Sequence, residues 1–151
     1  MQKPQYYSVV SGQGTSNYAL VAFDNALRQA GIGDYNLVKV SSILPPGCIY
    51  KEHINLEKGS IMYAAYATAT VIEGEMKVTA VAAAIPEDDK KNGVIFEHVT
   101  ETQDAEKKVR DMCLEAMNNR NRSIKEIKSS SLTIYGEKDK YVCSISAIVM
   151  W

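Results

Sequence analysis

The sequence has 151 residues, a formal net charge of −1, 46% apolar residues and 23% charged residues. This length and composition predict one soluble globular domain over residues 1–151 and exclude a largely disordered chain. No stretch reaches the roughly 20 apolar residues of a membrane helix, and the balanced charge argues against nucleic-acid and anionic-membrane partners. Cys48, Cys113 and Cys143 are an odd number at unrelated spacings, which argues against a disulfide framework and a zinc site and favours the reducing cytoplasm.

The N-terminal part of the sequence predicts a strand followed by a helix. Residues 5–11 are rich in aromatic and β-branched side chains, which are typical of a strand, and residues 12–15 contain two glycines that predict a turn. Ser16 or Asn17 is expected to cap the helix that follows, which runs to about Ala30. The expected apolar stripe of this helix consists of Leu20, Phe23, Leu27 and Ala30.

The middle of the sequence predicts three strands. The first covers residues 35–44 and ends at Pro45-Pro46, where the chain loses two backbone donors and must turn. Residues 59–72 and 76–85 are expected to form a hairpin of two long strands. Both are rich in alanine, a poor strand former, so we expect another layer to pack closely on them, with a helix as the weaker alternative.

The C-terminal part predicts a strand, a helix and a hairpin. Residues 94–100 form the strand, and the Thr100-x-x-Gln103 pattern after it resembles a capping box. Residues 124–135 and 141–151 are expected to form the final hairpin. The second helix carries an apolar face of Ala105, Val109, Met112, Cys113, Ala116 and Met117. Two amphipathic helices that must cover sheet faces predict an α+β or layered α/β class.

Several common catalytic signatures are missing from the sequence. Gly12-x-Gly14 lacks the third glycine of a dinucleotide fingerprint and the Lys-Ser/Thr of a phosphate loop, so an ordinary turn explains it better. His53 and His98 have no partners at metal-ligand spacing, and we therefore expect no metal site. No serine lies in a Gly-x-Ser-x-Gly elbow.

Three positions depart from the pattern around them, and such departures often mark functional sites. The first is Asp24, which lies within the apolar stripe of the first helix, so its carboxylate would face the packed side. A carboxylate held in a cleft there would bind a cation. A partly exposed aspartate with a local partner is the alternative, and the pattern alone slightly favours it.

The second departure is Glu97, which shares a strand face with Ile95 and Val99. Desolvation on that face would raise its pKa and keep a proton on it, as a general acid requires. A glutamate at a sheet edge that reaches solvent explains the pattern equally well. The third departure is the Ser41-Ser42 pair at the end of an apolar strand, although serines near turns are common.

Several longer segments, taken together, are more specific for a protein family than any single motif. The most specific is Ser41-Ser42-Ile43-Leu44-Pro45-Pro46 together with the helix before it. The full set comprises residues 22–27, 30–33, 36–46, 82–86, 93–97 and 105–112. Over nearly the whole chain, these segments resemble the pyruvoyl-dependent arginine decarboxylase family.

The resemblance implies a proenzyme that cuts itself between Ser41 and Ser42. The Ser42 hydroxyl attacks the carbonyl carbon of Ser41, and β-elimination of the resulting ester releases a chain that ends at Ser41. The remaining dehydroalanine hydrolyses with loss of ammonia and leaves a covalent pyruvoyl cofactor at position 42. This group forms a Schiff base with L-arginine and accepts electrons while CO2 leaves, which gives agmatine.

The resemblance also implies roles for these residues and for Asn36. Glu97 protonates the substrate Cα and assists processing, and Asp24 pairs with the guanidinium in a bidentate geometry that favours arginine. Asn36 stabilises an oxygen that becomes negative during self-cleavage, and Ser41 stays near the substrate as the new carboxyl terminus.

The architecture that the resemblance implies is an αββα sandwich assembled into trimers, or hexamers of paired trimers, with sites between subunits. Two alternatives stay open. One is a pyruvoyl-dependent decarboxylase of another amino acid, against which Asp24 argues because it favours a cationic side chain. The other is a non-catalytic oligomeric binding domain of the same fold.

Overall fold

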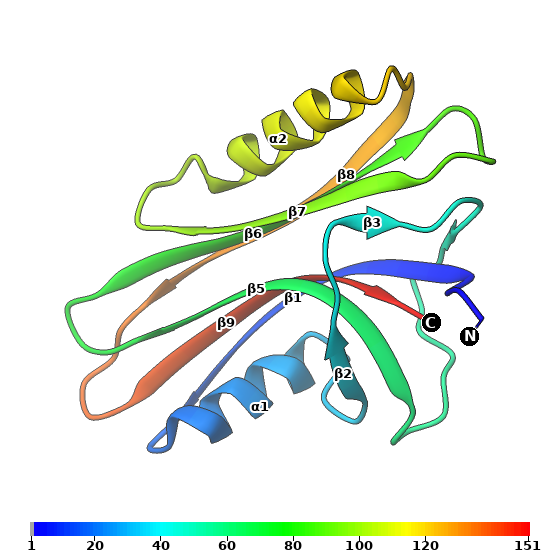
Figure 1. Cartoon of the computed structure of the whole chain (residues 1–151). Coiled ribbons are helices and arrows are strands. Elements are labelled where there is room, and N and C mark those ends of the chain that lie inside the picture. The colour runs from blue at the N-terminus through cyan, green and yellow to red at the C-terminus, as the bar shows by residue number, and fades with distance from the viewer. Residues whose placement is uncertain (1) are drawn as a thin grey trace.

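The computed structural model describes residues 2–151 and arranges nine strands and two helices in layers (Figure 1). In chain order the elements are β1 (Tyr6–Ser16), α1 (Ala19–Gln29), β2 (Asn36–Lys39), β3 (Ile43–Leu44), β4 (Ile49–Tyr50), β5 (Ile61–Val71), β6 (Met76–Pro86), β7 (Gly93–Thr100), α2 (Ala105–Asn119), β8 (Ile124–Tyr135) and β9 (Tyr141–Met150). None of the helices within residues 2–151 is long and apolar enough to cross a membrane.

The strands form two stacked sheets, each covered on its outer face by one helix. The five-stranded sheet has the order β2-β5-β9-β1-β4, and the four-stranded sheet has the order β3-β7-β6-β8. Helix α1 packs on β1 and β9, and α2 packs on β6, β7 and β8, on the far sides of the two sheets (Figure 1). The predicted αββα sandwich of the α+β class is therefore confirmed.

The space between the sheets is filled by small and branched side chains. Ala65 and Ile148 from one sheet pack against Val81, Ala83 and Ile95 from the other, and all five are fully buried. The expectation that alanine-rich strands lie under a closely packed layer is confirmed, since both faces of β6 are buried.

Hydroxyl groups cross the middle of the same space. The Oγ1 of Thr79 on β6 lies 3.0 Å from the Oγ of Ser146 on β9, and Ser11 on β1 lies 2.7 Å from Ser130 on β8. Ser11 also donates to Ser146 over 3.0 Å. Because buried hydroxyl groups need hydrogen-bond partners, this network fixes the position of one sheet relative to the other.

Both predicted hairpins are wrong in their pairing, although their strands exist. Strands β5 and β6 belong to different sheets, and so do β8 and β9, so each connection passes from one sheet to the other. A turn between two paired strands and a turn that passes from one sheet to the other use the same kinds of residue. The sequence pattern therefore could not separate the two arrangements.

The predicted turn over residues 12–15 is also wrong, because β1 continues to Ser16. Its glycines serve close packing instead of a turn. A Cβ atom added at Gly14 would lie 2.6 Å from the carbonyl oxygen of Ala22, and one added at Gly12 would lie 2.6 Å from the amide nitrogen of Ala30. Helix α1 therefore rests directly on the β1 backbone.

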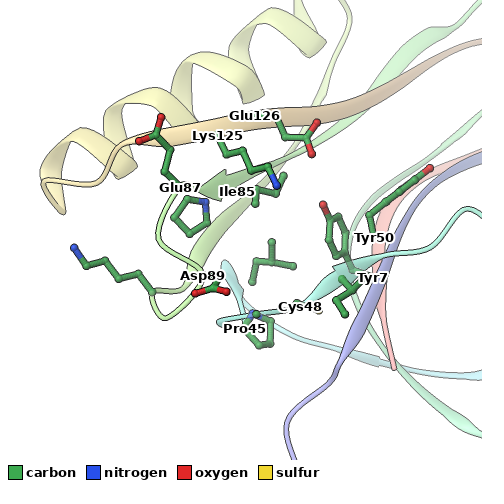
Figure 2. A pocket seen from close by; sticks show the side chains of 14 residues that line it. Tyr7, Pro45, Cys48, Tyr50, Ile85, Glu87, Asp89, Lys125 and Glu126 are labelled. Atoms are coloured by element: carbon green, nitrogen blue, oxygen red, sulfur yellow. The ribbon is translucent and has the colours of Figure 1, made fainter.

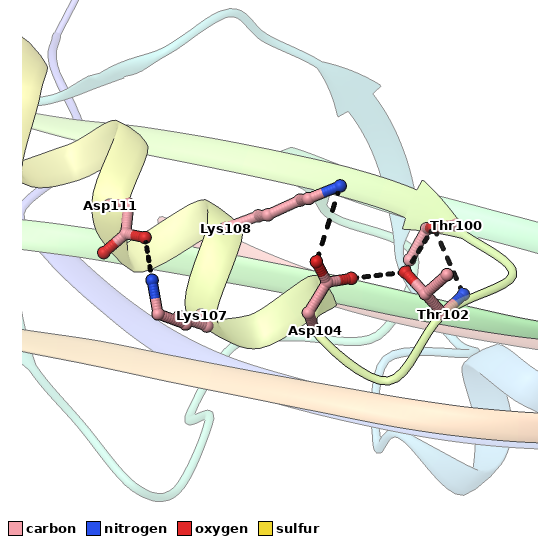
Figure 3. Close-up of polar contacts among 6 residues, drawn as sticks. All are labelled: Thr100, Thr102, Asp104, Lys107, Lys108 and Asp111. Carbon is pink, nitrogen blue, oxygen red and sulfur yellow. Dashed lines mark hydrogen bonds and ion pairs between the residues drawn. The ribbon is translucent and has the colours of Figure 1, made fainter.

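The helix starts differ from the predicted caps. Helix α1 begins at Ala19, and the N-cap position is Tyr18, whose amide donates to the Ser16 Oγ over 3.1 Å. Helix α2 follows Asp104, and the predicted capping box is not formed because Gln103 accepts a hydrogen bond from Thr133. The Thr102 hydroxyl instead donates to Asp104 (Figure 3). The apolar face predicted for α2 is buried, with Met112 only half-buried.

Candidate functional site

The Ser41–Ser42 peptide bond lies where the chain passes from one sheet to the other. The predicted strand over residues 35–44 is in fact two short strands, β2 in the five-stranded sheet and β3 in the four-stranded sheet (Figure 1). The Val40 amide still donates to the Ala64 carbonyl on β5 over 3.0 Å. The Ser42 carbonyl already accepts from the Ile95 amide on β7 over 2.8 Å. Backbone hydrogen bonds thus hold the chain on both sides of the Ser41–Ser42 bond, while the bond itself spans the space between the two sheets.

The pairing of β3 with β7 brings Glu97 close to this crossing. Ile43 pairs with Val94 in an antiparallel register, so Ser42 lies opposite Ile95. Glu97 is two residues further along β7 and therefore shares the face of Ile95. Diagonal neighbours of this kind have Cα atoms roughly 7–8 Å apart, which long side chains span. The fold therefore brings Ser41, Ser42 and Glu97 together.

The surroundings of Glu97 favour its protonated form. Its side chain is half-buried between the sheets, and this burial raises the pKa of its carboxyl group, which the nearby Lys39 ammonium partly opposes. The predicted direction of the pKa shift is confirmed. A carboxyl group with a raised pKa retains its proton to higher pH and can act as a general acid.

Lys39 was not singled out from the sequence. It ends β2 two residues before Ser41, and its Nζ lies 4.7 Å from the centroid of the Tyr66 ring on β5. Stacking on an aromatic face holds an ammonium group in a defined place. In the sequence, the signal for its role was a cationic residue two positions before the serine pair.

An open pocket of about 340 Å³ adjoins the crossing. Val40 and Ile43, which flank the serine pair, line it together with Tyr63 of β5 and Met150 of β9. The N-terminal residues 2–4 form its other side. The crossing is therefore accessible from solvent next to an apolar surface, and Ser41 itself is exposed.

Asp24 lies on the outer face of α1, away from the serine pair. The expectation that its carboxylate faces the packed side is wrong, and Asp24 is exposed, as the alternative had it, because Ala22, Ala26 and Leu27 occupy the packed side. Within residues 2–151 its carboxylate forms no ion pair. The five-stranded sheet separates it from Ser42, since α1 covers the outer side of that sheet (Figure 1).

Asn36 is also distant from the serine pair within one chain. It starts β2, and its Nδ2 donates to the carbonyl oxygen of Gly59 over 2.8 Å. The extended path from Asn36 to Val40 covers roughly 13 Å at about 3.3 Å per residue. A single chain therefore does not bring Asn36 or Asp24 to Ser42 and Glu97.

Comparison with known proteins identifies the family. Residues 6–151 match the model of the family described as "Pyruvoyl-dependent arginine decarboxylase (PvlArgDC)". Proteins named pyruvoyl-dependent arginine decarboxylase from Methanococcus maripaludis strain C5 and Methanopyrus kandleri are 34% and 30% identical, covering 99% and 100% of this chain and 92% and 99% of those proteins. "Pyruvoyl-dependent arginine decarboxylase 2" of Archaeoglobus fulgidus is 36% identical, covering 97% of this chain and 96% of that protein. This chain therefore belongs to the pyruvoyl-dependent arginine decarboxylase family, whose cofactor is a covalent pyruvoyl group.

Proposed function

We propose that this chain decarboxylates L-arginine to agmatine and CO2 with a pyruvoyl group that it makes from Ser42. The observation that carries the proposal is the position of the Ser41–Ser42 bond at the crossing between two sheets, beside the half-buried Glu97. Family membership and the names of the relatives support the choice of arginine.

The anchored backbone supports self-cleavage at this bond. Hydrogen bonds at Val40 and Ser42 restrict the chain on both sides, which favours attack of the Ser42 Oγ on the neighbouring Ser41 carbonyl carbon. The acyl group moves from nitrogen to oxygen, and loss of the Cα proton then breaks the Cβ–O bond and leaves a carboxylate at Ser41. Water replaces the nitrogen of the dehydroalanine, and ammonia leaves. Glu97 is the nearby group that would exchange protons in these steps.

Cleavage would produce fragments 1–41 and 42–151 that stay together. The first contains β1, α1 and β2, and β1 pairs with β9 from Tyr7 to Ser16. Strand β2 pairs with β5 in addition. Both contacts join the short fragment to the long one without a covalent bond.

The residues of this chain divide the catalytic work. The pyruvoyl group supplies an electrophilic carbonyl and an electron sink for the substrate. Glu97, whose pKa is raised by burial, would deliver a proton to the substrate Cα after CO2 leaves. Asp24 would pair with the guanidinium, because a carboxylate accepts two parallel hydrogen bonds from it. Asn36 would donate to the oxygen that becomes negative during cleavage.

These roles require more than one copy of the chain. Asp24 and Asn36 reach Ser42 and Glu97 only if a neighbouring subunit supplies one of the two pairs. The outer face of α1 exposes Leu20 and Val21 next to Asp24, as a face covered by another subunit would. We therefore propose a trimer or a hexamer with sites between subunits, located in the cytoplasm, where its three free cysteines would stay reduced.

Denaturing mass spectrometry of the purified protein tests the processing step. We expect fragments 1–41 and 42–151, the second lighter by ammonia than a simple hydrolysis product. Ser42→Ala should remain intact, whereas the control Ser60→Ala, on the loop before β5, should be cut normally. Intact wild-type chain after long incubation would contradict the proposal.

Release of CO2 from a panel of amino acids tests the substrate. We expect arginine to be strongly preferred over lysine, ornithine, histidine and aspartate, because only its guanidinium forms the bidentate pair with a carboxylate. A preference for another amino acid would favour the alternative of a pyruvoyl-dependent decarboxylase with a different substrate. A cut chain that releases CO2 from none of them would favour a binding domain.

A further inference from the structure

A second cavity, of about 450 Å³, lies between β4 and the start of β8 (Figure 2), and Leu44 and Pro45, just beyond the crossing, also line it. Leu44 and Ile85 give it an apolar surface, and the loop between β6 and β7 closes one side. Neither Ser42 nor Glu97 lines it. Its size is that of a small-molecule site, and nothing in the proposed reaction uses it.

Tyr7 is a buried polar group that faces this cavity. Its side chain is only 2% exposed, yet its hydroxyl forms no hydrogen bond within residues 2–151. No fully buried side-chain nitrogen or oxygen in the described chain lacks a partner, so the small exposed part of Tyr7 includes its hydroxyl, which opens into the cavity that Tyr7 lines. Burial, with a contribution from Glu126, raises the pKa of Tyr7, so the hydroxyl remains a donor. Buried hydroxyl groups normally have partners, so this one points to a ligand or a water.

The rim of the cavity carries unpaired charges of both signs. Lys91 lies 3.8 Å from Asp88, and Glu126 lies 3.7 Å from Lys128, so these two lining residues have ion-pair partners. Three other charged lining residues have none within the described chain: Glu87, Asp89 and Lys125. Figure 2 shows the Lys125 side chain extending over the cavity from β8.

We propose that this cavity binds a small zwitterion of the free α-amino-acid type, distinct from the substrate at the crossing. Its carboxylate would accept hydrogen bonds from the Lys125 ammonium and the Tyr7 hydroxyl. Its cationic group would meet Asp89, and its methylene groups would lie on Leu44 and Ile85. A ligand with only one kind of charge would leave one half of the rim unpaired.

Cys48 provides a probe that reports on this cavity alone. It lines the cavity and is half-buried, whereas Cys113 and Cys143 are 0% and 1% exposed. Burial raises the pKa of the Cys48 thiol to about 11, so iodoacetamide should alkylate it slowly enough to follow by intact mass. The uncleaved Ser42→Ala protein is the material of choice, because the result is then independent of turnover and of the proposed function.

The probe ligand is L-arginine, and the comparison ligand is agmatine, which lacks the carboxylate. At about ten times its dissociation constant, L-arginine should slow Cys48 alkylation about tenfold, because only the empty cavity reacts. Agmatine at the same concentration should leave the rate unchanged. Absence of protection by arginine up to about 10 mM, beyond the millimolar affinity range, would overturn the proposal. Equal protection by agmatine would overturn it as well.

Matched variants locate the protection. Lys125→Met should abolish it and Tyr7→Phe, which removes only the hydroxyl, should weaken it. Lys140→Met, in the turn before β9 and outside the cavity lining, should retain it. Full protection in Lys125→Met would show that arginine acts elsewhere and would contradict the assignment.

Discussion

The two helices cover equivalent faces of the sandwich but present opposite surfaces to the outside. Helix α1 exposes Leu20 at 83% and Val21 at 45%, and Tyr18 before it is 72% exposed. Helix α2 instead carries ion pairs on its outer face, with Lys107 2.6 Å from Asp111 (Figure 3). Apolar side chains grouped on one helix face are unfavourable in water, whereas charged pairs are well solvated. The α2 face therefore suits solvent, while the α1 face suits burial against another subunit.

The inner faces of the helices differ as well. Helix α2 packs on alanine side chains of β6, including Ala82 and Ala84. Helix α1 packs on the backbone of β1 at Gly12 and Gly14, where no side chain intervenes. The position of α1 is therefore set by backbone contact, and the position of Asp24 is set with it.

The largest expected effect comes from replacing the carboxylate on the outer face of α1. Asp24→Asn should lower kcat/KM for arginine about a hundredfold, close to 3 kcal/mol, because the proposed bidentate pair with the guanidinium would lose its negative charge. The matched change on α2, Asp111→Asn, should leave kcat/KM unchanged. Agmatine formation measures both. Unchanged kcat/KM in Asp24→Asn would show that the outer face of α1 is not part of the site.

A change beneath α1 should affect folding more than activity. Gly14→Ala adds a methyl group where the helix backbone already lies, and overpacking of this kind costs about 2–3 kcal/mol. Urea unfolding of the variant should show this loss, whereas the exposed neighbour Thr15→Ala should stay close to wild type. A Gly14→Ala protein of full stability would mean that α1 can shift outward freely.

Assembly should respond to the outer face of α1 and not to that of α2. Leu20→Glu should weaken association by about 2 kcal/mol, or about thirtyfold in the dissociation constant, because a charge would replace a leucine that the proposed subunit interface would bury. Leu114→Glu changes an exposed leucine on α2 and should have no effect. Light scattering over a concentration series distinguishes the two. Equal dissociation of both variants would erase the contrast between the helices.

The smallest effect is expected on the outer face of α2. Lys107→Met removes the pair with Asp111, but both side chains are largely exposed, and solvent screens such pairs. The urea midpoint and its dependence on salt should match those of the wild type. A clear loss of stability would show that α2 depends on its surface charges and is not a passive cover.

Local patterns predicted the layers of this fold better than their connections. Alanine-rich strands and two amphipathic helices were sufficient to predict an α+β or layered α/β class with another layer packed closely on the strands, because burial leaves a direct trace in composition. The αββα sandwich itself was implied by the family resemblance. The pairing of β5, β6, β8 and β9 leaves no such trace, since the side-chain pattern of a strand does not show which of the two sheets the strand joins. Gly12 and Gly14 looked like a turn because glycine is used both for turns and for close approach.

The site was predicted in part for the same reasons. Glu97 stood out because a carboxylate between apolar neighbours on one strand face departs from a short and regular pattern. Asp24 also departed from its pattern, but the predicted orientation of its side chain was wrong, because successive residues on a helix point about 100° apart. Lys39 was missed, since a lysine on an edge strand is ordinary in sequence and gains meaning only from Tyr66 beside it.

The sheet-to-sheet crossing at Ser41–Ser42 also affects how the molecule would unfold. Apart from any assembly of subunits, an intact chain unfolds as one molecule, so its unfolding midpoint does not depend on protein concentration. A chain cut at the crossing would release residues 1–41 as a separate molecule when β1 leaves β9. Its stability would then follow mass action and rise with concentration even within a single subunit. Self-cleavage would convert each folded subunit into a heterodimer.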